Sequence, residues 1–423
     1  MTVTPRRPPA NVRAADDGDE ILDVAVIGSG FGGIAMGRAL KRMGYRFAIL
    51  EAADAPGGTW RDNRYPGAAC DVPSHLYCFS FLANPDWSRK YSPQVEIERY
   101  LVDSLARLGL DSHLSLGARV TCAIFDEDDA IWSLDIAGGR RLRARHVVAA
   151  CGQLRNPKLP DIEGRDSFAG TAFHSSRWPK DLSLDGRRVG VIGSGATAIQ
   201  IVPAVAGQAA HVTMFQRTPN WIIARKDHAY GPFARWAFAH MPGWQKLYRA
   251  WIYWNFEVRW PTFAKNSRLR PLLERQALRF MREQLAERPD LWDRLTPDYP
   301  MGCKRILISD DFYPALARDD VTLETRRIAR IEPEGVRLAD DTLVPLDILV
   351  YATGFRAADF VAPMEVLGRD GRRLAEVWGD APFALNGVAV PGFPNFFLLY
   401  GPNTNLGHNS IIFMIECQAN YIV

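Results

Sequence analysis

The chain contains few cysteines, and their spacing excludes several kinds of site. Only six occur among its 423 residues, and no two of them form a Cys-x-x-Cys pair: they are Cys70, Cys78, Cys122, Cys151, Cys303 and Cys417. This spacing provides neither the redox dithiol of a disulfide reductase nor the ligand set of a zinc or iron–sulfur site. We therefore expect no bound metal and no thiol-based redox chemistry.

Long apolar runs and an excess of one charge are also missing. The most apolar early stretch, Leu22–Ala39, is interrupted by five glycines and an arginine, which argues against a transmembrane span. Residues 1–20 lack the uninterrupted apolar run that a secretory signal needs. We expect a cytoplasmic protein in which residues 1–20 form a disordered leader. The net charge of +3 comes from scattered residues, so we expect no basic patch of the kind that binds nucleic acid and no nucleic-acid partner. Nothing in the pattern specifies an oligomeric state.

A glycine motif follows directly on the first apolar strand. The strand Asp23–Ile27 leads into Gly28, Gly30 and Gly33, and Glu51 closes the next strand. In this strand–turn–helix setting the first glycine makes the tight turn, the second admits a pyrophosphate and the third lets the helix approach the strand. The carboxylate of Glu51 can accept the hydroxyl groups of an unphosphorylated ribose. The motif predicts a first nucleotide site, for FAD or NAD.

The same pattern recurs later in the chain with a different ending. The strand Arg188–Ile192 leads into Gly193, Gly195 and Ala198, which occupy the three small positions. After the following strand comes Arg217 in place of an acidic residue. An arginine there can pair with the 2′-phosphate of NADPH, although an ordinary surface arginine is the alternative interpretation. The second site is therefore predicted to prefer NADPH.

Two such units predict an α/β protein with two Rossmann-like dinucleotide-binding domains, the second inserted in the first. Apolar strands at Val350–Phe355 and Phe397–Pro402 are expected to return to the first sheet. We expect a discontinuous FAD-binding domain at residues 21–155 and 345–423, an NADPH-binding domain at residues 156–229 and 300–344, and a helical insertion at residues 230–299.

The expected insertion is unusually aromatic between Trp236 and Trp260. Such a stretch can line a substrate entrance or touch a membrane surface. Helices that pack on the second domain are the favoured interpretation, and peripheral membrane contact is the less favoured one.

Three longer segments carry a specific resemblance. They are GGTWRDNRYPGAACD at residues 57–71, FAGTAFHSSRWP at residues 168–179 and GCKRILISDDFYPAL at residues 302–316. The first resembles the fingerprint GGxWxxxx[FY]P[GM]xxxD of the Baeyer–Villiger monooxygenases, and the second resembles that family's FxGxxxHxxxWP. The Lys-Arg pair of the third resembles the family's segment that carries its essential arginine. Together with the nucleotide motifs, the resemblance extends from Asp23 to the end of the chain.

This resemblance implies a flavin monooxygenase that depends on FAD, NADPH and O2. In that family a flavin-bound peroxide attacks the carbonyl carbon of a ketone, and one oxygen atom is inserted to give an ester or a lactone. The expected substrate is thus a small organic molecule, most simply a ketone. An arginine suits the stabilisation of an anionic oxygen because it keeps its proton at any ordinary pH.

The resemblance also assigns roles to individual residues. Arg305 would stabilise the peroxide, and Asp71 would hold the guanidinium of Arg305 in place. Lys304 would reach the 2′-phosphate of NADPH together with Arg217 and Thr218.

The remaining assignments concern cofactor contacts and domain coupling. His174 and Trp178 would couple cofactor binding to domain movement and take no part in the chemistry. The expected FAD contacts are Gly28, Gly30, Phe31, Gly33, Glu51, Thr59, Trp60, Asp62, Asp71, Tyr77, Val120 and Asn403. The expected NADP contacts are Gly193, Ser194, Gly195, Ala196, Thr197, Ala198, Gln200, Arg217, Thr218, Lys304 and Arg305.

Two alternatives stay open from the sequence. The related N- or S-oxygenating flavin-containing monooxygenases share the nucleotide motifs but usually lack the ending Trp178-Pro179. The other alternative is a catalytically impaired or truncated flavin-binding protein. Chains of the Baeyer–Villiger family usually continue for several tens of residues beyond the position of Val423, and such a tail would close the substrate pocket and help to retain NADP.

Overall fold

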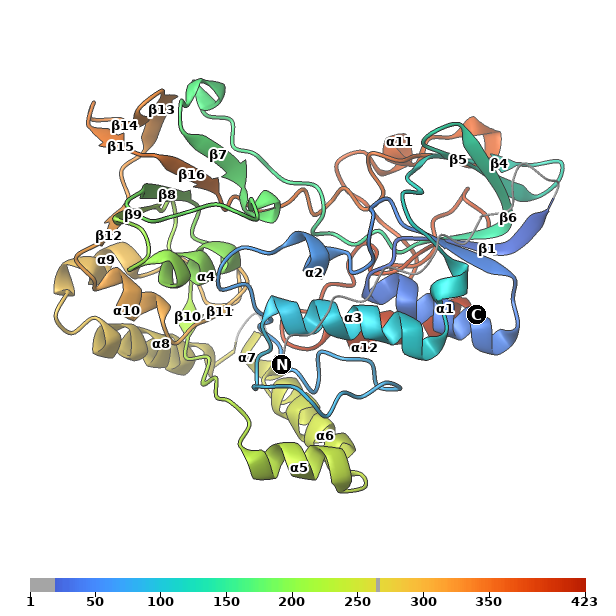
Figure 1. Ribbon diagram of the computed structural model, residues 1–423, viewed down its shortest axis with the longest axis horizontal. Helices are drawn as coiled ribbons and strands as arrows, with labels where there is room; N and C mark the ends of the chain where they lie inside the picture. Colours follow the sequence, from blue (N-terminus) through green and yellow to red (C-terminus); the bar gives the residue numbers. More distant parts are fainter. Residues whose placement is uncertain (1–19, 264–266) are drawn as a thin grey trace.

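Two sheets organise the chain, one for each glycine motif (Figure 1). The computed structural model describes residues 20–263 and 267–423. Apart from Glu20, the expected leader lies outside the described residues. The predicted α/β class with two dinucleotide-binding folds is confirmed.

The first sheet has eight strands in the order β17-β4-β5-β6-β1-β2-β3, with β18 also pairing with β6. Strand β1 is parallel to β2 and β6, whereas β5 is antiparallel to β4 and β6. The ten residues of β6 are enough for β5 to pair with its first half and β18 with its second half. The strands are β1 (Ile21–Ile27), β2 (Phe47–Leu50), β3 (Leu114–Ser115), β4 (Val120–Asp126), β5 (Ile131–Ile136), β6 (Arg140–Ala149), β17 (Glu365–Leu367) and β18 (Phe396–Leu398).

The second sheet is parallel throughout and has the order β12-β9-β8-β16-β7. Its strands are β7 (Thr171–His174), β8 (Arg188–Ile192), β9 (His211–Phe215), β12 (Val321–Glu324) and β16 (Ile348–Tyr351). All four residues of β16 are buried, as expected for a strand with neighbours on both sides.

One expectation about the return of the chain is therefore wrong. The segment Val350–Phe355 begins within β16, which pairs with β7 and β8 of the second sheet. A run of buried β-branched residues fits either parallel sheet equally well, so the sequence could not choose between them. The expected boundary at residue 345 thus gives one strand to the wrong domain. The segment Phe397–Pro402 does return to the first sheet, because β18 pairs with β6.

Two smaller sheets accompany the second one. The strands β10 (Ile222–Ile223) and β11 (Leu307–Ile308) form a parallel ribbon. The strands β13 (Ile328–Glu332), β14 (Gly335–Leu338) and β15 (Leu343–Pro345) form an antiparallel sheet.

Helices cover the faces of both main sheets. Buried side chains of α1, α3 and α12 join those of β1 and β2 in one core, and buried side chains of α4, α8 and α10 join those of β8 and β9 in another. The helices are α1 (Phe31–Met43), α2 (Thr59–Asp62), α3 (Gln94–Leu108), α4 (Ala196–Val205), α5 (Pro232–His240), α6 (Trp244–Glu257), α7 (Trp260–Phe263), α8 (Arg270–Gln284), α9 (Trp292–Leu295), α10 (Phe312–Leu316), α11 (Leu374–Trp378) and α12 (Ile411–Ile422). Across residues 20–263 and 267–423, none of these helices combines the length and the apolarity needed to cross a membrane.

The aromatic insertion is divided between the two cores. Helices α8 and α9 pack on the second domain, as favoured from the sequence. In contrast, α5 and α6 pack on the first domain, where Phe238 and Tyr248 surround the ring of His75. A stripe on α6 that includes Trp251 and Trp254 remains exposed. The interpretation that all of these helices pack on the second domain is thus correct for only part of the segment, since aromatic composition does not reveal which core a helix faces.

The first glycine turn shows why small residues are needed at the start of α1. Gly28 has a φ of +106°, and an added Cβ on Gly33 would lie 1.9 Å from the carbonyl oxygen of Gly28. Gly28 directly follows β1 and Gly33 lies within α1, so the backbone on either side of this contact cannot move freely. The motif therefore specifies close packing of α1 on β1 in addition to nucleotide approach.

We predict that Gly33→Ala destabilises the protein by about 3 kcal/mol because it overpacks this contact. The unfolding temperature of the FAD-loaded protein should fall by roughly 5 °C or more. Gly195→Ala is the matched control, since an added Cβ there has no protein atom within 4 Å. Equal unfolding temperatures for the two variants would contradict the packing role of Gly33.

Candidate functional site

A large cleft lies where the glycine loops of the two sheets face each other. Its volume is about 1660 Å³, and it is lined by residues of both nucleotide domains. Ordinary small-molecule pockets occupy roughly 300–1000 Å³, so this cleft has room for more than one ligand. Among the described residues, no group of three or more His, Cys, Asp or Glu side chains is arranged to hold a metal ion.

The first glycine loop is tied to the end of β2 by a carboxylate. One oxygen of Glu51 accepts hydrogen bonds from the N–H of Ser29 at 2.9 Å and from its hydroxyl at 2.7 Å. The other oxygen accepts from the N–H of Ala53 at 3.0 Å. Glu51 is buried and lines the cleft. It therefore lies where a ribose bound over this loop would meet an acceptor.

The second glycine loop is tied to the segment that follows β9. The hydroxyl of Ser194 donates to the carbonyl of Thr218 at 2.7 Å, and the side-chain amide of Asn220 donates to the carbonyl of Ser194 at 2.7 Å. These bonds hold Arg217 and Thr218 beside the loop at the edge of the cleft.

Both loops present the start of a helix to the cleft without a side-chain cap. The N-cap residues are Gly30 for α1 and Gly195 for α4, and neither helix has an acidic residue in its first turn. The first N–H groups of each helix thus lack a side-chain acceptor and favour an anion. An added Cβ on Gly195 would meet open space. This arrangement fits the pyrophosphate groups of two dinucleotides.

Aromatic rings line the cleft beside the first glycine loop. The indole N–H of Trp60 donates to the hydroxyl of Tyr77 at 3.1 Å, and the ring centroids of Phe31 and Tyr77 are 5.2 Å apart in an edge-to-face arrangement. Burial raises the pKa of Tyr77, so its hydroxyl stays protonated. One carboxylate oxygen of Asp62 is paired with Arg61 at 2.5 Å, and Asp62 lines the cleft.

An ion pair joins the two domains across the cleft. The Nη2 of Arg305 donates to Oδ2 of Asp71 at 2.5 Å. The carboxylate of Asp71 raises the pKa of Arg305. The side chain of Arg305 nevertheless remains 48% exposed and lines the cleft. The pair therefore holds a permanent positive charge where a ligand in the cleft can meet it.

Further contacts between the domains surround this pair. The hydroxyl of Tyr65 donates to Oε1 of Gln200 at 3.0 Å, and Nε2 of Gln200 donates to the carbonyl of Ala69 at 3.0 Å. An added Cβ on Gly67 would lie 2.4 Å from the carbonyl oxygen of Gln200. In this state Gln200, a predicted NADP contact, binds the loop of the first domain.

Nearly all predicted cofactor contacts are brought together here. The exceptions, which do not line the cleft, are Gly33, Ala198 and Asn403. Gly33 and Ala198 occupy the third small position of their motifs, where the helix packs on the strand. Asn403 is an exposed turn residue with a φ of +61°, and the same loop instead presents Asn405, Leu406 and Asn409 to the cleft.

The cleft is strongly basic, which the overall net charge of +3 conceals. Ten basic residues line it, against the four acidic residues Glu51, Asp62, Asp71 and Asp161. The basic residues are Arg61, Arg119, Arg155, Lys158, Arg177, Arg217, Lys304, Arg305, Arg326 and Arg327. Such a lining suits ligands that carry several phosphate groups.

Arg327 is a cleft residue that the sequence reasoning missed. It follows β12, and β12 pairs in parallel with β9, so Arg327 and Arg217 leave the sheet at the same edge. Arg326 is neutralised by Glu324 and Asp340, whereas the guanidinium of Arg327 has no ion-pair partner among the residues that the structure describes. No motif marks this position, and only the pairing of β9 with β12 reveals it.

His174 and Trp178 lie outside the cleft. The Nε2 of His174 is 2.9 Å from the carbonyl of Gly354, and its Nδ1 accepts from the N–H of Ser176. Burial, followed by the charge of Arg177, lowers the pKa of His174, so the ring is held neutral. His174 therefore connects β7 to the segment after β16, as a structural histidine does. Its role in domain coupling stays a prediction.

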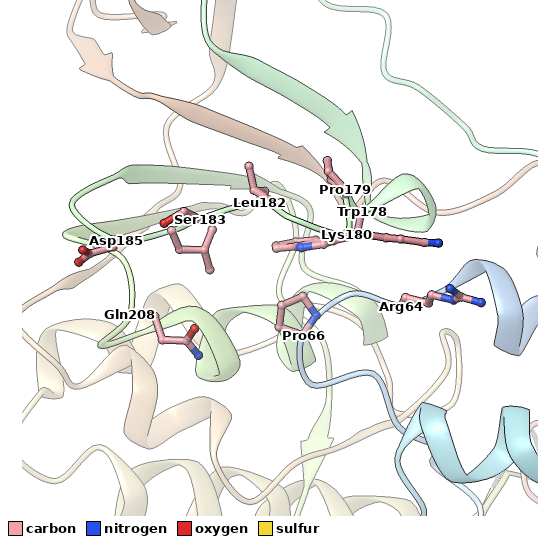
Figure 2. A pocket seen from close by; sticks show the side chains of 10 residues that line it. Arg64, Pro66, Trp178, Pro179, Lys180, Leu182, Ser183, Asp185 and Gln208 are labelled. Carbon is pink, nitrogen blue, oxygen red and sulfur yellow. The ribbon is translucent and has the colours of Figure 1, made fainter. Parts of the chain in front are cut away.

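Trp178 lines a smaller cavity of about 610 Å³ between the domains. Figure 2 shows this cavity between Arg64 and Pro66 on one side and the segment with Trp178 and Pro179 on the other. The ring of Trp178 also meets that of Phe173 edge to face at 5.1 Å. The end of the second fingerprint thus lies against the loop of the first.

His75 is a buried histidine that does not line the cleft. Its ring is packed among aromatic rings, and its Nε2 is buried without a hydrogen-bond partner in the described chain. Burial, followed by the charge of Arg249, lowers the pKa of His75 from 6.5 to about 4. Protonation is therefore easier in the unfolded chain than in the folded one.

We predict a loss of stability in acid that depends on His75. Neutral His75 contributes its full share to the free energy of unfolding above pH 6.5, and this share is lost as the pH falls to about 4. A pKa shift of that size corresponds to about 3 kcal/mol in the free energy of unfolding. His75→Phe should flatten the dependence of the unfolding temperature on pH over this window. An unchanged pH dependence in the variant would exclude His75 as the cause.

Comparison with known proteins gives two matches to family profiles. Residues 26–92 match a family described as an NAD(P)-binding Rossmann-like domain. Residues 76–234 match a family described as L-lysine 6-monooxygenase/L-ornithine 5-monooxygenase. Each profile covers less than half of the chain.

Relatives and solved structures match over most of the length. A Baeyer–Villiger monooxygenase of Streptomyces coelicolor is 43% identical over 404 residues, which is 95% of this chain and 78% of the relative. The open crystal structure of cyclohexanone monooxygenase matches with a TM-score of 0.83 and 31% identity, over 95% of this chain and 86% of that one. The crystal structure of OTEMO in complex with FAD and NADP matches with a TM-score of 0.83 and 29% identity, over 95% and 84%.

Proposed function

The chain belongs to the Baeyer–Villiger monooxygenase family, and from this membership we propose that it uses NADPH and O2 to insert one oxygen atom next to the carbonyl of a ketone. The product is an ester or a lactone. The chain is a flavin-dependent monooxygenase that binds FAD and NADP. The observation that supports the finer reaction most strongly is the ion pair of Arg305 with Asp71 at the cleft.

The half of the cleft formed by the first domain would hold FAD. The N-terminus of α1 would receive its pyrophosphate, and Glu51 would accept hydrogen bonds from its ribose. Phe31, Trp60 and Tyr77 provide the apolar wall for its ring system. When bound, FAD reduced by NADPH supplies the two-electron chemistry that activates O2.

The half of the cleft formed by the second domain would hold NADPH. The N-terminus of α4 would receive its pyrophosphate. Arg217 and Thr218 would hold the 2′-phosphate, and Arg327 would add a second guanidinium from the neighbouring strand end. The ammonium of Lys304 lies 4.4 Å from the ring centroid of Tyr299 and would reach the phosphate by a change of rotamer.

Arg305 acts on the oxygen atoms that carry negative charge during the insertion. It stabilises them without protonating them, because the pKa of an arginine lies far above any working pH and Asp71 raises it further. Asp71 keeps the guanidinium in one orientation, so that the charge is in place before the reaction begins. Part of the guanidinium remains open to the cleft for this purpose.

A second candidate function is N-oxygenation of an amine. The match of residues 76–234 to the lysine and ornithine monooxygenase profile supports it. In that reaction the transferred oxygen must be electrophilic. A cation such as Arg305, which stabilises negative charge on oxygen without donating a proton, is less useful for it. Incubation of the FAD-loaded protein with NADPH, O2 and separate panels of ketones, amines and sulfides tests both. Oxygenation of amines alone, with no ester from any ketone, would replace the first proposal by the second.

We predict that Arg305→Ala lowers ester formation from ketones by roughly 100- to 1000-fold, the usual effect of removing a preorganised charge. NADPH consumption should continue, with hydrogen peroxide as the product. Ester and NADPH are measured in parallel by chromatography and absorbance.

Two further variants make the Arg305 experiment specific. Arg305→Lys should recover part of the ester formation, because it restores a positive charge without the planar geometry. Arg235→Ala removes an exposed arginine of α5 and should leave the reaction unchanged. Ester formation that is insensitive to Arg305→Ala would exclude the proposed role of the cation.

We predict that Arg217→Ala raises the KM for NADPH by about 10-fold or more, the effect expected when a charge-assisted hydrogen bond to phosphate is lost. The KM for NADH should hardly change, because NADH lacks the 2′-phosphate. Both constants come from initial steady-state rates of coenzyme oxidation in the presence of O2 and a ketone, followed by absorbance. An equal rise in the KM for NADPH and for NADH would show that Arg217 does not bind the 2′-phosphate.

A further inference from the structure

Two arginines, one at each end of the ribbon of β10 and β11, contact the same short segment of the first domain. Arg225 follows β10 by two residues, and Arg305 precedes β11 by two residues. The strands are parallel, so these side chains leave opposite ends of the ribbon. They nevertheless contact consecutive residues of the first domain, with Arg225 at the carbonyl of Cys70 and Arg305 at the carboxylate of Asp71.

The backbone of Arg225 is held by the carboxylate of Asp310. One oxygen of Asp310 accepts the N–H of Arg225 at 2.8 Å and that of Lys226 at 3.0 Å, and the other accepts the N–H of Asp227 at 3.0 Å. A charged acceptor with three backbone donors restrains the segment strongly. Because Asp310 follows β11, the ribbon itself fixes the starting point of the Arg225 side chain.

The guanidinium of Arg225 crosses into the first domain. Its Nη2 donates to the carbonyl of Cys70 at 3.2 Å, and its central carbon lies 5.0 Å from the ring centroid of Tyr91. Its Nε is buried without a hydrogen-bond partner in the described residues. A guanidinium held in this way contributes little net stability, because burial of the charge offsets the contacts that it makes. Its removal should therefore leave the protein folded.

The peptide that Arg225 contacts is fixed on its other sides as well. The N–H of Cys70 donates to the carbonyl of Ser92 at 3.1 Å, and the sulfur of Cys70 accepts from the N–H of Val72 at 3.3 Å. Asp71 lies between these restraints, so the position of its backbone is fixed and the side chain starts from a defined point. A displacement of about 1 Å at such a position is enough to disturb a catalytic arrangement.

We propose that Arg225 is a positioning residue for oxygen insertion: it holds the Cys70–Asp71 peptide, and through Asp71 it sets the place of the Arg305 guanidinium. This inference rests on the proposed function. Arg225 acts through Asp71 and does not touch the reacting atoms. It also links the segment that follows β10 to the peptide that carries Asp71.

Arg225→Met is the test, because it removes the charge and keeps most of the apolar stem. The expected result is a drop of about fivefold or more in the amount of ester formed per NADPH consumed. The rate of flavin reduction by NADPH without oxygen should stay within about twofold of that of the unchanged protein, and FAD content should be equal. Arg225→Lys should recover part of the ratio, since its ammonium can still donate to the carbonyl of Cys70. Arg235→Met is the matched control on the neighbouring helix and should change nothing.

The double variant Arg225→Met/Arg305→Ala separates positioning from a general structural effect. If Arg225 acts through Arg305, the double variant should give the same ratio as Arg305→Ala alone. Additive losses, a ratio that Arg225→Met does not change, or an equal fall in flavin reduction would each overturn the inference. An absence of any effect of Arg305→Ala on the ratio would instead overturn the proposed function, and this inference with it.

Discussion

The ion pair of Arg305 with Asp71 connects residues 234 positions apart and belonging to different domains. Its geometry exists only when the second sheet faces the first. An arginine on one domain alone would lie at a surface, solvated and free to change rotamer. An aspartate on the other domain alone would be an ordinary loop residue. Held together at the cleft, they form a cation of fixed direction, and such preorganisation is the main contribution that a protein can make to stabilising charge during a reaction.

The surroundings of this pair are built from the first fingerprint. Within residues 57–71 the side chain of Tyr65, the carbonyl of Ala69 and the close approach of Gly67 all meet Gln200 on α4. The fingerprint is therefore an interface between the domains, in addition to the flavin contacts proposed for it. This explains physically why it combines small residues, which permit close approach, with a terminal carboxylate that reaches the other domain.

The basic lining of the cleft has a related cause. Two dinucleotides bring several phosphate groups into one space, and their mutual repulsion must be offset by the protein. Uncapped helix starts provide part of this compensation, and the arginines and lysines that follow the strand ends provide the rest. The chain as a whole stays near neutrality because its acidic residues lie mostly elsewhere on the surface. Balanced composition and a strongly polarised site are thus compatible.

The sequence alone determined the two glycine motifs, the strands that carry them, and the identity of Arg305 and Asp71, because each depends on local geometry or on a fingerprint read along the chain. The meeting of nearly all of the expected cofactor contacts in one cleft depends on the packing of the two domains. Tertiary structure alone decided which sheet receives β16, which core receives α5 and α6, that Arg327 lines the cleft, and that Arg225 contacts the carbonyl of Cys70. The sequence of a buried strand or an aromatic helix does not indicate which sheet or core it packs against. An isolated arginine has no surrounding motif that would identify its role. Such choices depend on contacts between residues far apart in the sequence, and they arise only when the whole chain packs.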